Sequence, residues 1–183
     1  KFLIAYLIYE DGVNTVIVFS SIFAATTLKF KPDELIYMYL LVQAVALLGA
    51  FAMARHIDIK GPKRIVCATL CLWIFVTICS FFVNSKGLFV VIASLAGLGL
   101  GTLQAATRAF FSLFIPRGEE SRYFGVYNLV GKSSAVIGPV IFGYTSSLFK
   151  SQRPAILSVC LFFVAGLIVV SFVRINKKDP VFE

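Results

Sequence analysis

Long apolar runs recur along this chain and constrain its fold more than any other feature. Each run reaches the ~20 residues that an α-helix needs to cross ~30 Å of hydrocarbon at ~1.5 Å per residue. A transmembrane β-barrel would instead show ~10-residue segments of alternating polarity, and the sequence has none. The sequence therefore predicts an all-α, polytopic membrane protein. We expect six spans, at about Phe2–Thr27, Leu35–Ala54, Ile65–Val83, Leu88–Ile115, Phe124–Phe149 and Pro154–Val173.

The connectors between the spans are short and rich in turn-forming and charged residues, so none can hold a soluble domain. An even number of spans puts both termini on one side of the membrane. That side would collect ten cations: Lys1, Arg55, Lys60, Lys63, Arg64, Arg117, Arg122, Arg174, Lys177 and Lys178. The opposite side would hold five: Lys29, Lys31, Lys86, Lys150 and Arg153. The positive-inside rule then predicts cytoplasmic termini, and the net charge of +8 is an orientation signal and not a nucleic-acid footprint.

Only 14% of the residues are charged, and their pattern predicts neither a cofactor nor a metal site. The cysteines Cys67, Cys71, Cys79 and Cys160 lie within spans and form no CxxC pair, which is typical of small buried hydrophobic residues. The single histidine, His56, lies among basic residues in a connector. No Ser-His pair, histidine cluster or metal-ligand spacing occurs, so we do not expect an enzyme.

The connector after the second span holds the first specific motif. It reads ARHIDIKGPKR from Ala54 to Arg64, with Asp58, Gly61 and Lys63 at fixed intervals. This pattern resembles the signature loop of the major facilitator superfamily, G-x-x-x-D-x-x-G-x-[RK], with an alanine for the leading glycine. The resemblance implies a tight turn between two helices at Gly61, a helix N-terminus capped by Asp58, and cations at the cytoplasmic face.

Longer segments resemble one branch of this superfamily. They are FLIAYLIYEDGVNTVI in the first span, GTLQAATRAFFSLFIPRGEESRYFGVYNLVGKSSAVIGPVIFG across the fourth and fifth, and SQRPAILS before the sixth. Together they resemble the vacuole-effluxer-like branch, which is named for the autophagy-related vacuolar amino-acid exporter of fungi. The resemblance implies helices seven to twelve of a twelve-helix transporter, whose partner is an N-terminal six-helix half; a complete chain would instead pair as a parallel homodimer. An echo of the signature loop at Gly143, Ser147 and Arg153 fits two inverted three-helix repeats.

Glu10 and Asp11 place two carboxylates inside the first span. A charge at the bilayer centre costs ~2.5–3.5 kcal/mol on the insertion scale, so such groups usually face the protein interior or a water-filled cavity. Both lie ~12–14 Å from Phe2 and point ~100° apart, so we expect one to face the cavity and the other a neighbouring helix. The branch pattern resembles Y-x-D-G-V here, which favours Asp11 as the functional acid. Lys132 is expected at the same depth and is a candidate partner, in a pair that either opens during transport or permanently joins two helices.

The fourth span carries a stripe of small and polar residues. Gly97, Gly101, Gln104 and Arg108 follow i, i+4, i+7 and i+11 and so share one helix face. The glycines lie in an apolar helix with no preceding strand, which indicates close helix packing and not a dinucleotide site. Gln104 suits a zwitterionic or amide-bearing solute, or helix packing. Arg108 is expected to meet a substrate carboxylate, to pair with another helix or to snorkel to the interface.

The remaining candidate residues lie on the first and fifth spans. Asn14 is the third polar residue of the first span, and Asn128 shares a face with Lys132 on the fifth. Gly138 and Pro139 are expected to bend the fifth span near its middle, where rocking motion could be accommodated.

These features predict a secondary active transporter of small solutes that works by alternating access in the lipid bilayer. The resemblance implies amino-acid efflux, and the intramembrane acid favours proton coupling. One alternative is a lipid or amphiphile transporter of the same superfamily, with a Phe-rich cavity. Another is a non-transporting membrane assembly or partner protein, in which the intramembrane charges would be sealed and dry. The resemblance favours a bacterial inner membrane, with a vacuolar membrane as the alternative.

Overall fold

The computed structural model describes residues 1–173, and over this range the chain forms seven α-helices and no β-strand. The prediction of an all-α protein is confirmed. Arg174, Lys177 and Lys178, which contribute to the expected cytoplasmic charge, lie outside the described residues. The helices are α1 (Phe2–Thr26), α2 (Pro32–Lys60), α3 (Pro62–Phe82), α4 (Lys86–Ser112), α5 (Glu120–Ser133), α6 (Ile137–Phe149) and α7 (Gln152–Ser171).

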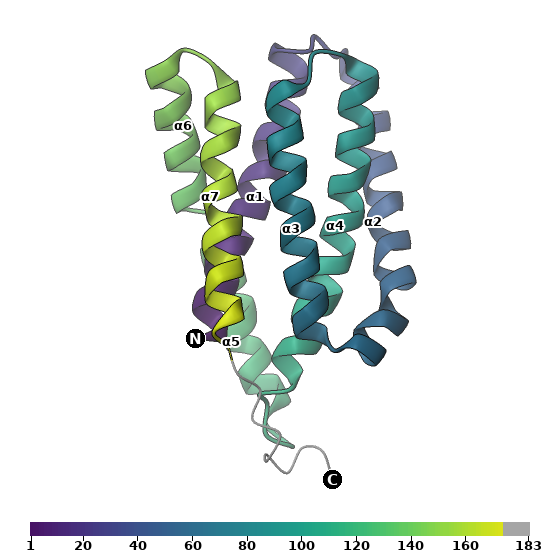
Figure 1. Cartoon of the computed structure of the whole chain (residues 1–183), viewed down its shortest axis with the longest axis vertical. Coiled ribbons are helices and arrows are strands. Elements are labelled where there is room, and N and C mark those ends of the chain that lie inside the picture. Colours follow the sequence, from purple (N-terminus) through teal and green to yellow (C-terminus); the bar gives the residue numbers. More distant parts are fainter. Residues whose placement is uncertain (174–183) are drawn as a thin grey trace.

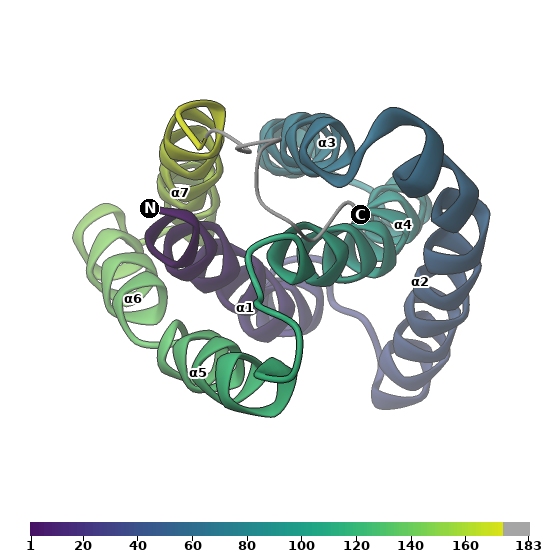
Figure 2. The same cartoon turned by 90° about the horizontal axis from the view of Figure 1, so that it is seen from below.

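The helices run up and down the molecule and form one bundle (Figure 1). α4 packs against α2 and α3, and α7 packs against α1, α3 and α6. Seen from below, α2, α3 and α4 lie on one side and α5, α6 and α7 on the other, with α1 reaching between them (Figure 2). The α1–α2, α3–α4 and α6–α7 junctions lie at one end, and the N-terminus with the α2–α3 and α4–α5 junctions lies at the other (Figure 1).

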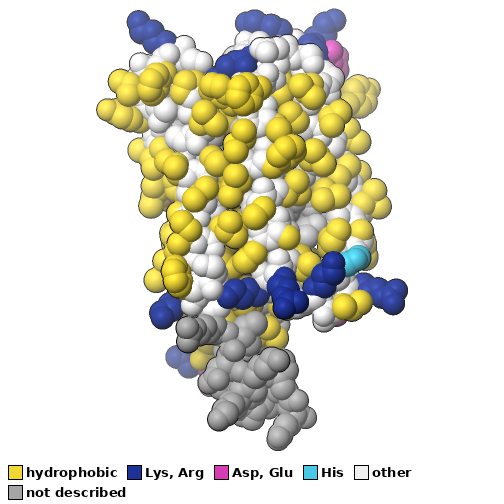
Figure 3. Space-filling model, viewed as in Figure 1, with side chains coloured by type: hydrophobic (Ala, Val, Ile, Leu, Met, Phe, Trp, Pro, Cys, Tyr) yellow, Lys and Arg dark blue, Asp and Glu magenta, His cyan; other side chains and the backbone are white. Residues whose placement is uncertain are grey.

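Five helices, α1, α2, α3, α4 and α7, are long and apolar enough to cross a membrane. Apolar side chains cover the middle of the molecule, and Lys and Arg gather at its two ends (Figure 3). α2 is the most exposed of the five, with Tyr37, Leu48 and Phe51 among its outward-facing apolar residues. This distribution is the inverse of a soluble surface and fits contact with lipid tails.

The segment expected as the fifth span, 124–149, differs from a single helix, because it is built from two short helices. α5 has 14 residues, α6 has 13, and the chain is non-helical from Ser134 to Val136. Pro139, the third residue of α6, has no N–H, and its ring would clash with the carbonyl of Ala135 in a continuous helix. The bend expected near Gly138 is therefore a complete break just before it.

The junction after α2 also differs from expectation. Ala54 and Asp58 lie within α2, which continues to Lys60 because no glycine or proline stands between Ala54 and Lys60. The connector is the single residue Gly61, whose φ of 84° suits glycine, and Pro62 starts α3. The signature segment is thus a helix end with a one-residue corner and not an 11-residue loop.

Glycines set the close approach of α4 to α2. A Cβ on Gly101 would collide with the carbonyl of Ala46, and one on Gly49 would lie 2.8 Å from the carbonyl oxygen of Leu98. Gly97 meets Val42 in the same way. The close helix packing expected at Gly97 and Gly101 is present.

Charged side chains hydrogen-bond the ends of neighbouring helices, α3 and α7, at both ends of the bundle. Lys63 Nζ donates to the carbonyl oxygens of Ser171 (2.8 Å) and Val173 (2.7 Å) at the end of α7. At the other face, Arg153 donates to the carbonyl oxygens of Phe81 and Val83, both at 2.7 Å, where α3 ends. These cations satisfy carbonyls that have no partner within their own helices.

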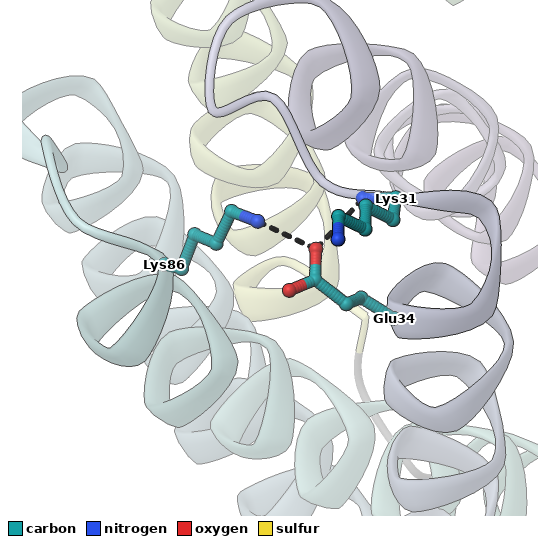
Figure 4. A network of polar contacts seen from close by, with 3 residues as sticks. All are labelled: Lys31, Glu34 and Lys86. Carbon is teal, nitrogen blue, oxygen red and sulfur yellow. Dashed lines mark hydrogen bonds and ion pairs between the residues drawn. The ribbon is translucent and has the colours of Figure 1, made fainter.

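A smaller network joins the starts of α2 and α4 at that second face (Figure 4). Glu34 Oε2 accepts from the backbone N–H of Lys31 at 2.7 Å and from Lys86 Nζ at 2.5 Å. About 40% of each charged side chain in the Lys86–Glu34 pair is exposed, so the ion pair contributes little stability.

Candidate functional site

Asp11 lies in the middle of α1, and its carboxylate meets the start of α6. The residue is 1% exposed, and its Oδ2 accepts a hydrogen bond from the backbone N–H of Gly138 at 2.9 Å. The backbone amides of Val136 and Ile137 face the same carboxylate. Asp11 Oδ1 has no hydrogen-bond partner among the described residues. The acid therefore occupies the position of a helix N-cap, supplied by another helix.

Two further residues of α1, Asn14 and Thr15, also contact the α5–α6 break. Thr15 Oγ1 donates to the Asp11 carbonyl oxygen at 2.6 Å, and a Cβ on Gly138 would collide with that hydroxyl. Asn14 Nδ2 donates to Ser134 Oγ at 3.1 Å, and Ser134 Oγ donates to the carbonyl of Gly131 at 2.6 Å. One turn of α1 thus fixes both sides of the α5–α6 break.

Glu10 points into different surroundings, as the ~100° spacing of neighbouring helical residues requires. It is half-buried and lies within electrostatic range of Arg108 on α4 and of Tyr6 and Tyr127, whose rings stack at 4.4 Å between centroids. The preceding residue, Tyr9, hydrogen-bonds Thr107 at 3.0 Å between hydroxyl oxygens. Because Glu10 follows Tyr9 and Arg108 follows Thr107, the two charges lie at one level of the bundle.

Lys132 does not pair with either acid. It is exposed near the end of α5, and no ion pair joins it to Glu10 or Asp11 within residues 1–173. The expected ion pair is absent because the amides of α6 take the place of the ammonium at Asp11. Asn128 is exposed on the same face of α5, one turn earlier.

Gln104 and Arg108 line an open groove between α2 and α4 with a volume of about 420 Å³. Gln104 also lines a second cavity, of about 290 Å³, between α1, α2, α3 and α4. Its walls are mainly apolar, with Trp73 and Phe89 among them, and its polar lining includes Ser20, Gln43 and Ser80. Gln43, Ser20 and Ser80 were not expected as site residues, because isolated polar residues in apolar helices give no motif.

The signature residues lie apart from these cavities. Lys63 reaches the end of α7, as described above, and Gly61 forms the corner. Asp58 and Arg64 are exposed, and neither side chain hydrogen-bonds another described residue, so the expected cap by Asp58 is not formed. Their role stays a prediction from the resemblance.

Comparison with known proteins decides the family. The model of the family described as "Vacuole effluxer Atg22 like" matches residues 1–180. The chain belongs to this family. It is 26% identical, over 94% of its length, to the MFS-type transporter YxiO of Bacillus subtilis. It is 34% identical to autophagy-related protein 22 of Vanderwaltozyma polyspora over 78% of its length, and 28% identical to that of Kluyveromyces lactis over 91%.

The chain spans between 29% and 40% of the lengths of these three relatives. The vacuole-effluxer-like branch inferred from the motifs is confirmed, and with its apolar helices this member of the family is an integral membrane protein. The candidate residues lie in two places: Asp11, Asn14 and Thr15 are at the broken helix, and Gln104 and Arg108 line the open groove, with Glu10 within electrostatic range of Arg108.

Proposed function

We propose that this chain is the C-terminal six-helix half of a secondary transporter that moves small solutes by alternating access. The observation that carries the proposal is a buried carboxylate, Asp11, held at a broken helix in the middle of an apolar bundle. Intramembrane charges are costly and usually mark solute or ion pathways, and broken helices at membrane depth are a feature of transporter sites. The name of the Bacillus subtilis relative, an MFS-type transporter, and the description of the family as vacuole effluxers support the same activity.

The arrangement of the helices supports an assembly from two inverted repeats, α1–α3 and α4–α7. Lys63 is the second residue of α3, and Arg153 is the second residue of α7. Each caps the C-terminal carbonyls of the other's helix, at opposite faces of the bundle. Such reciprocity is expected where two repeats are related by an axis in the membrane plane. An N-terminal six-helix half would then cover the groove lined by Gln104 and Arg108.

The solute that fits best is an amino acid moving outward. Glu10 and Arg108 carry opposite charges at one level without forming an ion pair, so each is free to meet one end of a zwitterion. Gln104 adds an amide donor and acceptor one turn away. Proton coupling would use the intramembrane carboxylates. A bacterial inner membrane or a vacuolar membrane, with cytoplasmic termini, is the corresponding location.

The test is uptake of a labelled amino-acid mixture by proteoliposomes, with and without an imposed pH gradient. Gradient-driven uptake that falls at least tenfold in Arg108→Gln and in Asp11→Asn is expected. The control is Arg117→Gln, an exposed residue of the α4–α5 connector, which should keep the uptake of the parent. Absence of uptake by folded protein, under either gradient direction, contradicts the proposal.

A second candidate is a lipid or amphiphile transporter, which the mainly apolar walls of the 290 Å³ cavity favour. Fluorescent lipid transfer between leaflets of the same proteoliposomes separates the two solute classes. A non-transporting assembly role would require sealed charges, whereas Lys132 and Arg108 are exposed.

A further inference from the structure

The start of α6 depends on a side chain from another helix. α4 and α7 begin with Ser85 and Ser151, each of which accepts a hydrogen bond from its own first turn. The N-cap of α6 is Val136, which has no side-chain acceptor, and Pro139 removes one donor from the first turn. The Gly138 amide is satisfied by Asp11, which is 127 positions earlier in the chain.

The two oxygens of Asp11 are not equivalent. Oδ2 accepts from Gly138, whereas Oδ1 is buried and has no donor within the described residues. A buried carboxylate oxygen without a donor is unfavourable, and binding a proton there relieves it. The capping oxygen would remain an acceptor after protonation, but the bond would change from charge-assisted to neutral, which is roughly half as strong.

Among residues 1–173, no charged side chain forms an ion pair with the Asp11 carboxylate. The groups at the start of α6 that face it are backbone amides, and the α7 residues packed against the next residue, Gly12, are Phe162 and Phe163, which do not titrate. From α5, Ser134 lies at the break and Lys132 forms no ion pair with Asp11. From α4, the charge of Arg108 acts on Glu10, the neighbour of Asp11 on α1.

We propose that Asp11 is a protonation-dependent latch: ionised, it holds the start of α6 against α1, and protonated, it releases α6 to move independently of α5. The latch also explains why the chain breaks between α5 and α6, because in one continuous helix the α6 half could not move without the α5 half. Its use in transport rests on the proposed function, but the latch itself acts within the bundle.

The experiment measures the position of α6 directly. Spin labels are attached at Leu40→Cys on α2 and Tyr144→Cys on α6, both exposed, with the four native cysteines replaced by serine. The helices α2 and α6 lie on opposite sides of the bundle (Figure 2). The distance distribution in nanodiscs is recorded by pulsed electron paramagnetic resonance at neutral and mildly acidic pH. Rocking of the bundle as one rigid body leaves this distance unchanged, so a change in it reports movement of α6 relative to α2.

We expect one narrow distribution at neutral pH that broadens or shifts on acidification. Asp11→Asn should show the acidic distribution at both pH values, and Glu10→Gln should respond to pH like the parent. If Asp11→Asn does not fold, Gly138→Ala tests the same point, because its Cβ displaces Thr15 and opens the cap with the acid intact.

A distribution that is independent of pH in the parent, or a pH response that survives in Asp11→Asn, overturns the latch. Movement of α6 without amino-acid uptake would keep the latch and contradict the proposed function. Amino-acid uptake without movement of α6 would contradict the latch and leave the proposed function in place.

Discussion

At Gly101, the missing side chain sets the separation of two helices. Replacing Gly101 by alanine should destabilise the protein by about 1–3 kcal/mol, because the new Cβ meets the carbonyl of Ala46 and forces α2 away from α4. Gly143→Ala is the matched control, since nothing lies within 4 Å of the place its Cβ would take and alanine favours a helix interior by about 0.5–1 kcal/mol. Unfolding midpoints in detergent would move in opposite directions, and equal shifts would contradict the packing described here.

The Tyr9–Thr107 hydrogen bond is a second single contact with a measurable effect. Both residues are buried, so Tyr9→Phe and Thr107→Val should each lower the free energy of unfolding by about 1–3 kcal/mol, since each leaves one hydroxyl unpaired. The double variant should cost less than the sum of the two. Additive losses in a double-mutant cycle would show that the hydroxyls are not bonded to each other.

At the scale of helices, Lys63 and Arg153 join α3 to α7 at both ends. Lys63→Gln and Arg153→Gln should each cost about 1 kcal/mol, because the helix-end carbonyls lose a charged donor. Arg64→Gln, one residue from Lys63 and exposed, should leave the midpoint unchanged. A loss in Arg64→Gln as large as in Lys63→Gln would assign the effect to surface charge and not to capping.

The helix ends also show what the sequence could predict. Apolar run lengths predict six crossings, because hydrocarbon thickness fixes the length of a helix that spans it. Five of the described helices are long and apolar enough to cross a membrane. Proline and glycine indicated the corner at Gly61 and the bend before Pro139. The extension of α2 to Lys60 was not predicted, because charged residues were taken for a connector although nothing in them stops a helix.

The candidate site was less predictable than the helices. The acids were found because charge is rare in a span, and their divergent surroundings follow from helix geometry. The partner of Asp11 was expected to be a cation, Lys132, whereas backbone amides of α6 fill that place. A backbone partner leaves no mark in a sequence, and this contact joins residues 127 positions apart.

For the whole molecule, the unequal charge of its two ends predicts its orientation. Among residues 1–173, seven Lys and Arg residues lie at the end with the α2–α3 and α4–α5 junctions, against five at the other. At the end with five cations, Lys86 forms an ion pair with Glu34, and Arg153 donates hydrogen bonds to backbone carbonyls. Both cations are therefore already engaged within the bundle. The excess on the first end favours the cytoplasm for that end.

Cysteine labelling tests this orientation. Lys60→Cys and Lys150→Cys place exposed thiols at opposite ends, in a background without the native cysteines. In intact bacterial cells, a membrane-impermeant maleimide should label Lys150→Cys and spare Lys60→Cys, and permeabilised cells should label both. The reverse pattern would put the groove lined by Gln104 and Arg108 in the opposite orientation and would contradict the cytoplasmic termini of the proposed transporter. Labelling of both positions in intact cells would mean that the charge difference is too small to fix the orientation.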